Sequence, residues 1–275
     1  MININEADIM QCIAAMHLQE QKTPRCINYF QRTTVVDESS RAAMVNWLCQ
    51  ISDALSLNRE TVGFAMSLLD RYLSTNTNGA KQALADKHKF QLAAITTYYI
   101  AVKINEPVQL GVDMLVKLCR GFYESSAIVS MEQDILFSLE WRISAPTPLD
   151  FMRQILRLLP TSERCIGENA EMHIANVTKD SHFSAFAPSL VGAACVAMAF
   201  RESNVTASTE QVLLWDMICN TLELDTSYDF LGVQQQLQSK STKKPTPIGR
   251  AITTLTRRSS YIHLGDSSSP VSVNV

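Results

Sequence analysis

Hydrophobic residues recur along almost the whole chain with the spacing of an α-helix, and the strict alternation of a β-strand is scarce. In the first such stretch, about residues 5–20, Ile9, Ile13 and Met16 lie on one face of the predicted helix. The same pattern predicts further helices at about residues 41–51, 59–73, 87–103, 111–119, 124–139, 148 onward, 165–183, 188–202, 208–220 and 226–237. The predicted fold class is therefore all-α.

Several of these stretches open with residues that typically cap a helix, and two of them show the signal well. Ser39 or Ser40 precedes the second predicted helix. In "TPLD", Thr147 is placed as a cap, Pro148 takes the first helical position, and Asp150 reaches back toward the cap. These signals predict where the two helices begin.

The predicted helices form two sets separated by a short break. One leading helix and five further helices precede the linker "SAPTP", and about five helices follow it, which predicts a repeated all-α architecture. From about residue 238 the chain is rich in Ser, Thr and basic residues and loses its periodicity, so we predict a mostly disordered tail. The predicted divisions are 1–35 (leading helix and linker), 36–143 (first repeat), 144–237 (second repeat) and 238–275 (tail).

Composition and charge narrow the class of protein. Hydrophobic residues make up 46% and charged residues 19% of the 275 residues, the balance of a globular protein with a proper core. The net charge of −3 gives no reason to expect binding to nucleic acid or to an anionic membrane. The most apolar stretch, 185–200, is too short for a membrane span, and the N-terminus does not have the basic start of a signal peptide. Seven scattered cysteines without a C-x-x-C pair predict reduced intracellular thiols rather than disulfides or a zinc site.

The sequence contains no recognisable catalytic machinery. Phosphate-binding glycine loops, the G-x-S-x-G nucleophile motif and the H-E-x-x-H metal motif are absent, and the five histidines are dispersed. We therefore expect no catalytic residue, no metal and no cofactor, and a protein that is not an enzyme. A basic cluster near the C-terminus fits a nuclear import signal or a nucleic-acid contact, but a solvated tail is the simpler interpretation. The cluster comprises Lys240, Lys243, Lys244, Arg250, Arg257 and Arg258.

Three charged residues stand inside apolar helical sequence. Arg41 precedes "AAMVNWL", and Asp70 lies within "LLDRYL", where an unpaired charge is costly to bury. Either the two residues pair across adjacent helices, or each is partly exposed on its own, and spacing alone favours the second alternative. Lys103, in "YYIAVKINEP", is equally ambiguous, because a lysine near a helix end commonly extends its stem toward water.

Four segments of the chain resemble the cyclin box family. The clearest is residues 40–74, where R-A-x-x-V-x-W-L, E-T and L-D-R-x-L-S occur at the spacings of the family. The resemblance resumes at 89–107 and 130–151, and it returns more weakly at 188–199. It implies two tandem five-helix cyclin folds, with an N-terminal cyclin box in the first repeat and a C-terminal cyclin fold in the second.

Cyclin boxes have five nearly fixed positions, which fall here on Arg41, Asp70, Leu92, Lys103 and Glu132. The resemblance implies an internal salt bridge between Arg41 and Asp70 that joins the first two helices of the box. It also implies that Lys103 and Glu132 contact a cyclin-dependent kinase near its regulatory C helix. Such a contact activates the kinase without supplying a catalytic atom.

The same alignment places apolar residues around this kinase contact. The apolar kinase-binding positions of the family fall on Ile100, Ile104, Leu136, Trp141 and Ile143. The leading helix, with Ile9 and Ile13, is expected to pack against the same kinase surface. Asn105 stands where many relatives have an acid.

A second surface is implied by the shallow patch with which some cyclins recruit substrates or inhibitors. Its positions fall on Ala43, Met44, Trp47, Gln50, Phe90 and Gln91. The M-R-A-I-L of the family reads S-R-A-A-M here, and Gln50 replaces an acid. Met44 and Trp47 remain as candidate anchors, but the smaller residues and the lost acid predict a weaker preference for basic-x-leucine motifs.

The resemblance implies a non-catalytic regulatory subunit that binds and activates a cyclin-dependent Ser/Thr kinase, with a role in cell-cycle control. The alternative is a cyclin-fold scaffold of the transcription machinery that binds nucleic acid, which would leave Lys103 and Glu132 unexplained. The expected partners are the kinase and, through the patch, its substrates or inhibitors, with no membrane and no nucleic acid. The expected location is the nucleus, the cytoplasm or both.

Overall fold

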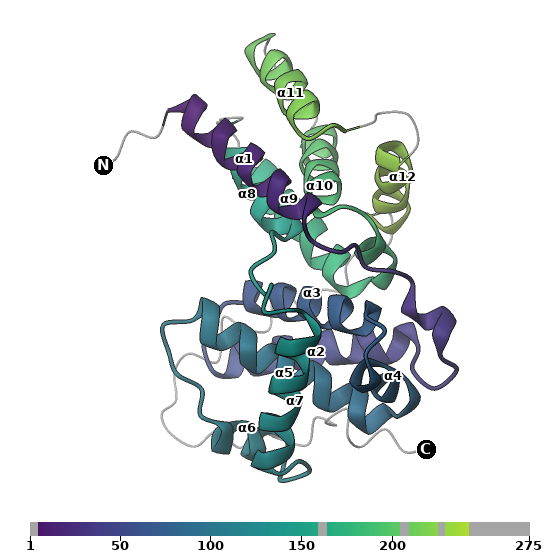
Figure 1. Ribbon diagram of the computed structural model, residues 1–275. Helices are drawn as coiled ribbons and strands as arrows, with labels where there is room; N and C mark the ends of the chain where they lie inside the picture. The colour runs from purple at the N-terminus through teal and green to yellow at the C-terminus, as the bar shows by residue number, and fades with distance from the viewer. Residues whose placement is uncertain (1–4, 159–163, 204–208, 225–228, 242–275) are drawn as a thin grey trace.

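Two helical bundles are stacked on one another, and the polypeptide passes from the first to the second at the linker before α8 (Figure 1). A computed structural model describes residues 5–158, 164–203, 209–224 and 229–241. Every regular element within these residues is a helix, which confirms the predicted all-α fold. The first bundle contains η1 (Tyr29–Arg32), α2 (Glu38–Ala54), α3 (Glu60–Ser74), α4 (Asn78–Ala85), α5 (Lys87–Asn105), α6 (Val112–Leu118) and α7 (Ser125–Ser138). The second contains α1 (Glu6–Gln21), α8 (Pro148–Leu158), α9 (Arg164–Lys179), η2 (Ser181–Ala185), α10 (Pro188–Ser203), α11 (Thr209–Thr221) and α12 (Asp229–Ser241).

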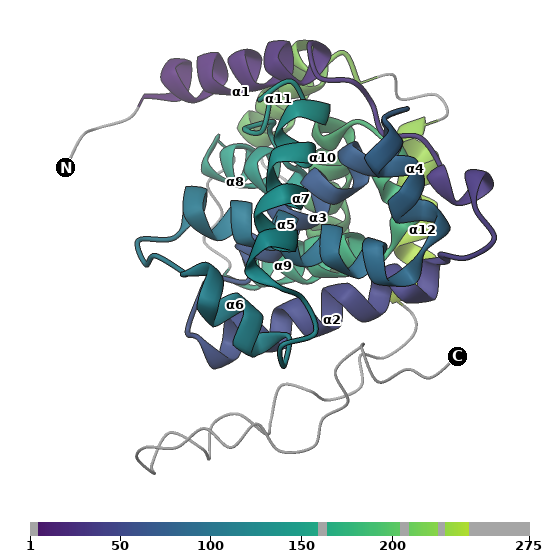
Figure 2. The ribbon, with the colours of Figure 1, turned by 60° about the horizontal axis from the view of Figure 1, so that its bottom comes forward.

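The first bundle is built around α5. Its residues are buried without a break from Ala93 to Val102, so every face of the helix is covered by a neighbour. α3 packs along it, and α2, α4 and α7 contact its other sides, with α7 crossing in front of it in Figure 2. The small side chains of Ala93, Ala94 and Ala101 are fully buried and let these helices approach closely.

The second bundle repeats this plan around α10, which packs against α8, α9 and α12. Its buried run extends from Val191 to Val196. Gly192 sits where α8 and α10 are closest: a Cβ at this position would lie 2.5 Å from the Pro148 carbonyl oxygen and 2.9 Å from the Cβ of Phe151. Only glycine therefore fits at this crossing without moving α8.

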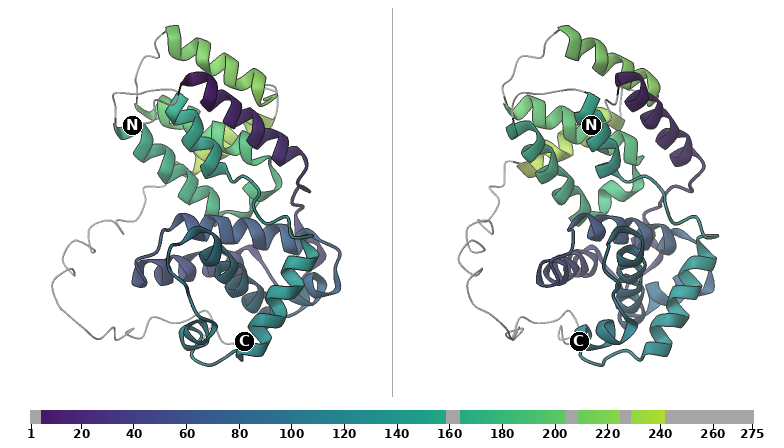
Figure 3. Two further views of the ribbon diagram at one scale, coloured as in Figure 1. Left: turned by 60° about the vertical axis from the view of Figure 1, so that its left-hand side comes forward. Right: turned by 90° about the vertical axis from the view of Figure 1, so that its left-hand side faces the viewer.

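The first helix of the chain, α1, packs on the second bundle, as Figure 3 shows. Ile9 and Ile13 are buried in the core of that bundle. At the other end of α1, the Glu20 carboxylate accepts hydrogen bonds from the backbone N and the hydroxyl of Ser189, at 2.7 and 2.6 Å, beside the N-terminus of α10. The prediction that Ile9 and Ile13 face a kinase is therefore wrong, because α1 uses them to pack against its own chain.

Helix α4 was not predicted from the sequence. It is only 8 residues long and begins with Asn-Gly, a dipeptide that is typical of turns. Its buried face consists of Ala80, Ala83 and Leu84. A Cβ at Gly79 would lie 1.8 Å from Oδ2 of Asp134 on α7, so a larger residue at this position would require the Asp134 side chain to move. The helix packs against α3 and α5, so contacts with distant parts of the chain, and not local periodicity, account for it.

Two of the predicted helix starts had different outcomes. Asp37, and neither Ser39 nor Ser40, caps α2, and its carboxylate accepts a hydrogen bond from the backbone N of Ser40 at 2.8 Å. Hydrogen bonds from Ser40 and Ser39 lower the pKa of Asp37 to about 2. At α8 the predicted box is present, because the Asp150 carboxylate accepts hydrogen bonds from the backbone N and the hydroxyl of Thr147 at 2.8 and 2.7 Å.

Two predicted helix ends also differ from the structure. α9 stops before its predicted boundary, and η2 follows, because the Asp180 carboxylate accepts a hydrogen bond from the backbone N of His182 at 3.0 Å and starts a new turn. α12 continues to Ser241, past the predicted boundary at 238. The rest of the predicted disordered tail, 242–275, lies outside the described residues.

Candidate functional site

The described part of the chain gives no sign of a membrane span or a metal centre. None of its helices is both long and apolar enough to cross a bilayer. It contains no group of three His, Cys, Asp or Glu side chains that could hold a metal ion, and all seven cysteines are free thiols.

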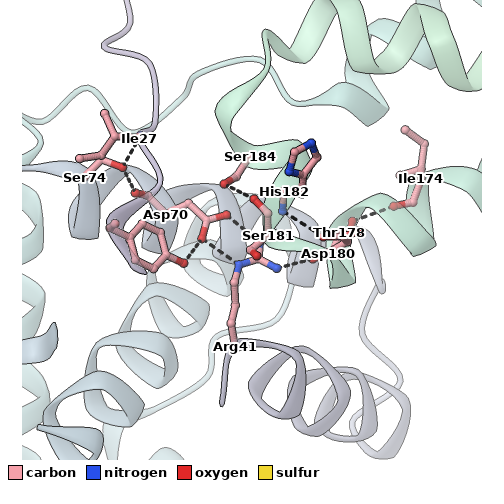
Figure 4. Close-up of polar contacts among 11 residues, drawn as sticks. Ile27, Arg41, Asp70, Ser74, Ile174, Thr178, Asp180, Ser181, His182 and Ser184 are labelled. Carbon is pink, nitrogen blue, oxygen red and sulfur yellow. Dashed lines mark hydrogen bonds and ion pairs between the residues drawn. The ribbon is translucent and has the colours of Figure 1, made fainter. Parts of the chain in front are cut away.

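Arg41 and Asp70 form a buried ion pair between α2 and α3 (Figure 4). Nε and Nη2 of Arg41 donate to the two carboxylate oxygens of Asp70 at 2.9 and 2.6 Å, and both side chains are only 3% exposed. The hydroxyl of Tyr29 donates to the same carboxylate at 2.7 Å, and Nη1 of Arg41 donates to the Thr178 carbonyl oxygen at 2.8 Å. Since Thr178 belongs to α9, this pair joins two helices of the first bundle and also links the first bundle to the second.

Burial and charge act in opposite directions on this cluster. Burial disfavours the charged form of Arg41, but the adjacent Asp70 carboxylate raises the arginine pKa still further above its usual value. Burial and the negative charge of Asp70 also raise the pKa of Tyr29, which therefore stays a neutral hydrogen-bond donor. The cluster keeps one positive and one negative charge, and it is satisfied within the protein, which suits a structural joint rather than a binding site.

Lys103 and Glu132 form a second ion pair, between the last turn of α5 and the middle of α7. Nζ of Lys103 lies 2.6 Å from Oε1 of Glu132 and 4.0 Å from the centre of the Tyr99 ring. The two side chains are 42% and 16% exposed, so both charges remain accessible to water or to a partner. Partial burial alone would lower the pKa of Lys103, but the hydrogen bond to Glu132 and the contact with Tyr99 raise it. Lys103 is therefore a stable cation.

Exposed apolar side chains lie close in sequence to both members of this pair. Ile104 follows Lys103 at the end of α5 and is exposed. Trp141 and Phe137, from the end of α7 and the residues after it, are 61% and 68% exposed, and their rings meet edge to face with centres 6.0 Å apart. Phe137 was not singled out in the sequence, although its spacing of four from Trp141 is the signal that could have identified it. We call Lys103, Ile104, Glu132, Phe137 and Trp141 the α5–α7 surface.

The other apolar residues predicted for this site lie deeper. Leu136 and Ile143 are half-buried against the first core, and so is Leu92. Ile100 is fully enclosed in that core, so its predicted role as a kinase contact is wrong. The reason is that α5 is covered on every side from Ala93 to Val102, and after this buried run its side chains become exposed again only at Lys103.

The backbone at Trp141 has a conformation that is uncommon for a large side chain. Glu140 and Trp141 have φ values of 51° and 60°, in the left-handed region that favours glycine. The backbone N of Trp141 donates to the Leu136 carbonyl oxygen at 2.9 Å, which closes the end of α7. This turn directs the indole away from the core, at a cost of about 1–2 kcal/mol for each left-handed residue.

Asn105 and Glu106, which follow Lys103 in the sequence, lie in different surroundings. Asn105 is exposed at the end of α5. Glu106 turns toward α3, where its carboxylate accepts hydrogen bonds from the backbone N of Asn58 at 2.9 Å and from the hydroxyl of Thr61 at 2.5 Å. Glu106 therefore fixes the end of α5 to the start of α3, and it does not contribute a charge to the α5–α7 surface.

The predicted recruitment patch on α2 is only partly accessible. Met44 and Phe90 are each only 1% exposed, so their predicted places in a surface patch are wrong, because both side chains belong to the core of the first bundle. Trp47 is half-buried and Gln50 is exposed. The part that remains accessible consists of Trp47, Gln50, Ala43 and Gln91.

Two stacked helical bundles, each built around a buried central helix and joined by a buried arginine–aspartate pair, define a protein of the cyclin-fold class. Residues 9–144 match the family described as "Cyclin, N-terminal domain", and the chain belongs to the cyclin family. Members of this family are regulatory rather than catalytic proteins, in agreement with the expectation that the chain is not an enzyme.

The chain is similar to several mitotic cyclins over most of its length. It is 26% identical to the G2/mitotic-specific cyclin-2 of Antirrhinum majus over 207 residues, which cover 71% of this chain and 45% of that protein. It is 29% identical to the G2/mitotic-specific cyclin-B2 of Oryzias latipes over 189 residues, which cover 66% of this chain and 45% of that protein. The aligned region thus spans less than half the length of these relatives.

A solved structure shows the same arrangement of helices. The viral cyclin from herpesvirus saimiri superposes with a TM-score of 0.64 at 18% identity, and the match covers 84% of this chain and 96% of that one. At this level of identity the likeness establishes the fold.

Proposed function

We propose that the chain binds and activates a cyclin-dependent Ser/Thr protein kinase by fixing the position of the kinase C helix. The observation that carries this proposal is the accessible Lys103–Glu132 pair near exposed apolar side chains of the α5–α7 surface. Exposed aromatic residues contribute little to an isolated chain, whereas aromatic residues supply much of the energy at protein interfaces. The names of the mitotic relatives support a role in the cell cycle.

The charged and the apolar parts of the surface have different roles in this proposal. Phe137 and Trp141 present large rings, and burying them against a partner supplies affinity. Lys103 and Glu132 supply register, since each can accept one more polar contact: the ammonium has three donors, and the carboxylate has a second oxygen. A backbone segment with one accessible carbonyl and one accessible N–H, such as a loop beside a helix, is the complementary partner.

The activation step follows from the chemistry of kinases. A protein kinase is active only when a lysine on its third strand pairs with a glutamate on its C helix, because that lysine aligns the phosphates of ATP. A partner that binds the inward position of the C helix more tightly than the outward position shifts the kinase toward its active state. The partner contributes no catalytic group, so a chain without catalytic motifs can perform this function.

The test is a binding and activity assay with a panel of purified cyclin-dependent kinases. The wild-type chain should bind at least one of them and raise its rate of phosphate transfer to a peptide. Lys103→Ala and Glu132→Ala should each weaken binding by about 2–5 kcal/mol, because each leaves a charge unpaired in the interface. Lys89→Ala is the matched control, since Lys89 lies on the same helix and donates to Gln82 at 2.6 Å. Absence of binding to every kinase, or variants that bind like the wild type, would overturn the proposal.

A further inference from the structure

The segment that carries Trp141 and Ile143 has no regular secondary structure of its own. After the two left-handed residues, the backbone N of Ile143 donates to the Trp141 carbonyl oxygen, and that of Ala145 donates to the Ile143 carbonyl oxygen, both at 3.0 Å. Each is a turn of three residues, the smallest kind, with few internal hydrogen bonds to stabilise it. The orientation of the Trp141 indole therefore depends on contacts from outside the segment.

Arg71 on α3 supplies such a contact. Its guanidinium donates through Nη2 to the carbonyl oxygen of Arg142, and through Nη1 to that of Ile143 at 3.4 Å. Arg71 is only 7% exposed, and no carboxylate within the described ranges forms an ion pair with it. A buried charge without an ionic partner is costly, so the two carbonyl contacts are its main compensation in this structure.

Asp70 and Arg71 are consecutive residues of α3, but their side chains contact different parts of the protein. Consecutive residues on a helix point about 100° apart. Asp70 points toward Arg41 at the junction of the two bundles, and Arg71 points toward the peptide that follows α7. An apolar residue at position 71 would fill the same space without the cost of desolvating a charge. The advantage of arginine here is that its planar guanidinium can donate hydrogen bonds to two carbonyl oxygens at once.

We infer that Arg71 is a positioning residue for the α5–α7 surface: it holds the 142–143 peptide so that Trp141 and Ile143 are presented to a partner. The use of that presentation in kinase binding rests on the proposed function. The positioning itself is a property of the free chain, and it can be measured without a kinase.

The positioning is tested by fluorine NMR of the full chain labelled with fluorotryptophan. The chain has three tryptophans, and the Trp141 resonance is assigned by its loss in Trp141→Phe. Arg71→Met removes the donors and keeps the stem, and Arg71→Lys keeps the charge without the fork. Both should shift or broaden the Trp141 resonance and leave those of Trp47 and Trp215 in place. An unchanged Trp141 resonance in both variants would overturn the inference.

Two controls separate positioning from loss of stability. Arg142→Ala removes an exposed side chain of the same segment but leaves the carbonyl that Arg71 contacts. Ser52→Ala removes a buried hydrogen bond of 2.8 Å to the hydroxyl of Tyr98, in the core and away from the segment. Neither should move the Trp141 resonance, and a shift in Ser52→Ala equal to that in Arg71→Met would mean that general destabilisation is the cause, which would overturn the inference.

A binding measurement then connects the positioning to the partner. With a kinase that binds the wild-type chain, Arg71→Met should weaken the affinity about tenfold. In a Trp141→Ala background the same substitution should have little further effect, because both changes act through one ring. Fully additive losses would contradict this connection. If no kinase binds, the proposed function fails, whereas the NMR result still decides whether Arg71 positions Trp141.

Discussion

Two ion pairs of the first bundle, Arg41–Asp70 and Lys103–Glu132, combine similar charges in opposite surroundings. Arg41 and Asp70 are closed off from water, and their remaining hydrogen-bonding groups contact Tyr29 and the second bundle. Lys103 and Glu132 are 42% and 16% exposed, on two helices whose C-terminal ends carry exposed apolar side chains. The role of a charged residue in an apolar helix therefore depends on whether other side chains cover it. The first pair joins elements of the fold, and the second leaves donors and acceptors for a partner.

This difference has an energetic consequence that can be measured. Removing one member of a buried pair leaves a charge without compensation and costs about 3–5 kcal/mol, whereas an exposed pair contributes about 0–1 kcal/mol. We therefore expect substitutions at the first pair to affect the free energy of unfolding. We expect substitutions at the second pair to affect binding alone.

The largest effect should come from Arg41→Ala. It strands the Asp70 carboxylate in the core and should lower the free energy of unfolding by about 3–5 kcal/mol, measured by urea denaturation. Arg59→Ala is the matched control, because Arg59 makes the same two-pronged contact with Asp53, at 2.7 and 2.6 Å, on the exposed surface. The control should change stability by less than about 1 kcal/mol. Equal losses in the two variants would remove the distinction between buried and exposed pairs.

A smaller effect, on binding, is expected for Trp141→Ala. Deleting a large exposed ring at the centre of an interface should weaken kinase binding by about 2–4 kcal/mol while leaving the unfolding free energy within about 0.5 kcal/mol of the wild type. Phe122→Ala is the control, since Phe122 is an exposed aromatic residue of the same bundle that stacks on His88, outside the α5–α7 surface. If both variants bind equally well, the aromatic part of the surface has no role in affinity.

The smallest effect should come from Asp37→Ala, which removes the cap of the helix that carries Arg41. The expected loss is about 1 kcal/mol of unfolding free energy at neutral pH. The pKa of about 2 in the folded chain lies below the ordinary value for aspartate, so the carboxylate stabilises the fold at neutral pH, and this contribution disappears as pH falls toward 2. The difference between wild type and variant in thermal unfolding should therefore shrink between about pH 4 and about pH 2. A difference that stays constant or grows in acid would contradict the assignment of Asp37 as the cap.

Local patterns in the sequence were sufficient to predict most of the helices. Periodicity located them, and the capping box at Thr147 and Asp150 was correct because its partners are three residues apart. The same reasoning missed α4, a short helix that begins with Asn78 and Gly79, a dipeptide typical of turns, and packs against α3 and α5. Local sequence patterns do not predict a helix that is stabilised mainly by contacts with residues distant in the sequence.

The candidate site was predicted less completely, for a related reason. The family resemblance gave the Arg41–Asp70 pair, but the contact of Arg41 with the Thr178 carbonyl joins residues 137 apart and depends on how the bundles stack. It also assigned Ile100 to the surface, where the surrounding helices in fact bury it. Phe137 was missed because its spacing of four from Trp141 places the two rings close together but does not show whether they are exposed or belong to the core.

The most direct test exchanges the charges of the exposed pair. Lys103→Glu combined with Glu132→Lys keeps an ion pair between α5 and α7 but reverses which helix presents the donor. If the pair provides register for a kinase, the exchanged chain should have the melting temperature of the wild type and should lose kinase binding by about 2–5 kcal/mol, measured on the same preparation. An exchanged chain that binds and activates the kinase like the wild type would show that the pair serves only the fold, which would contradict the proposed function of the α5–α7 surface.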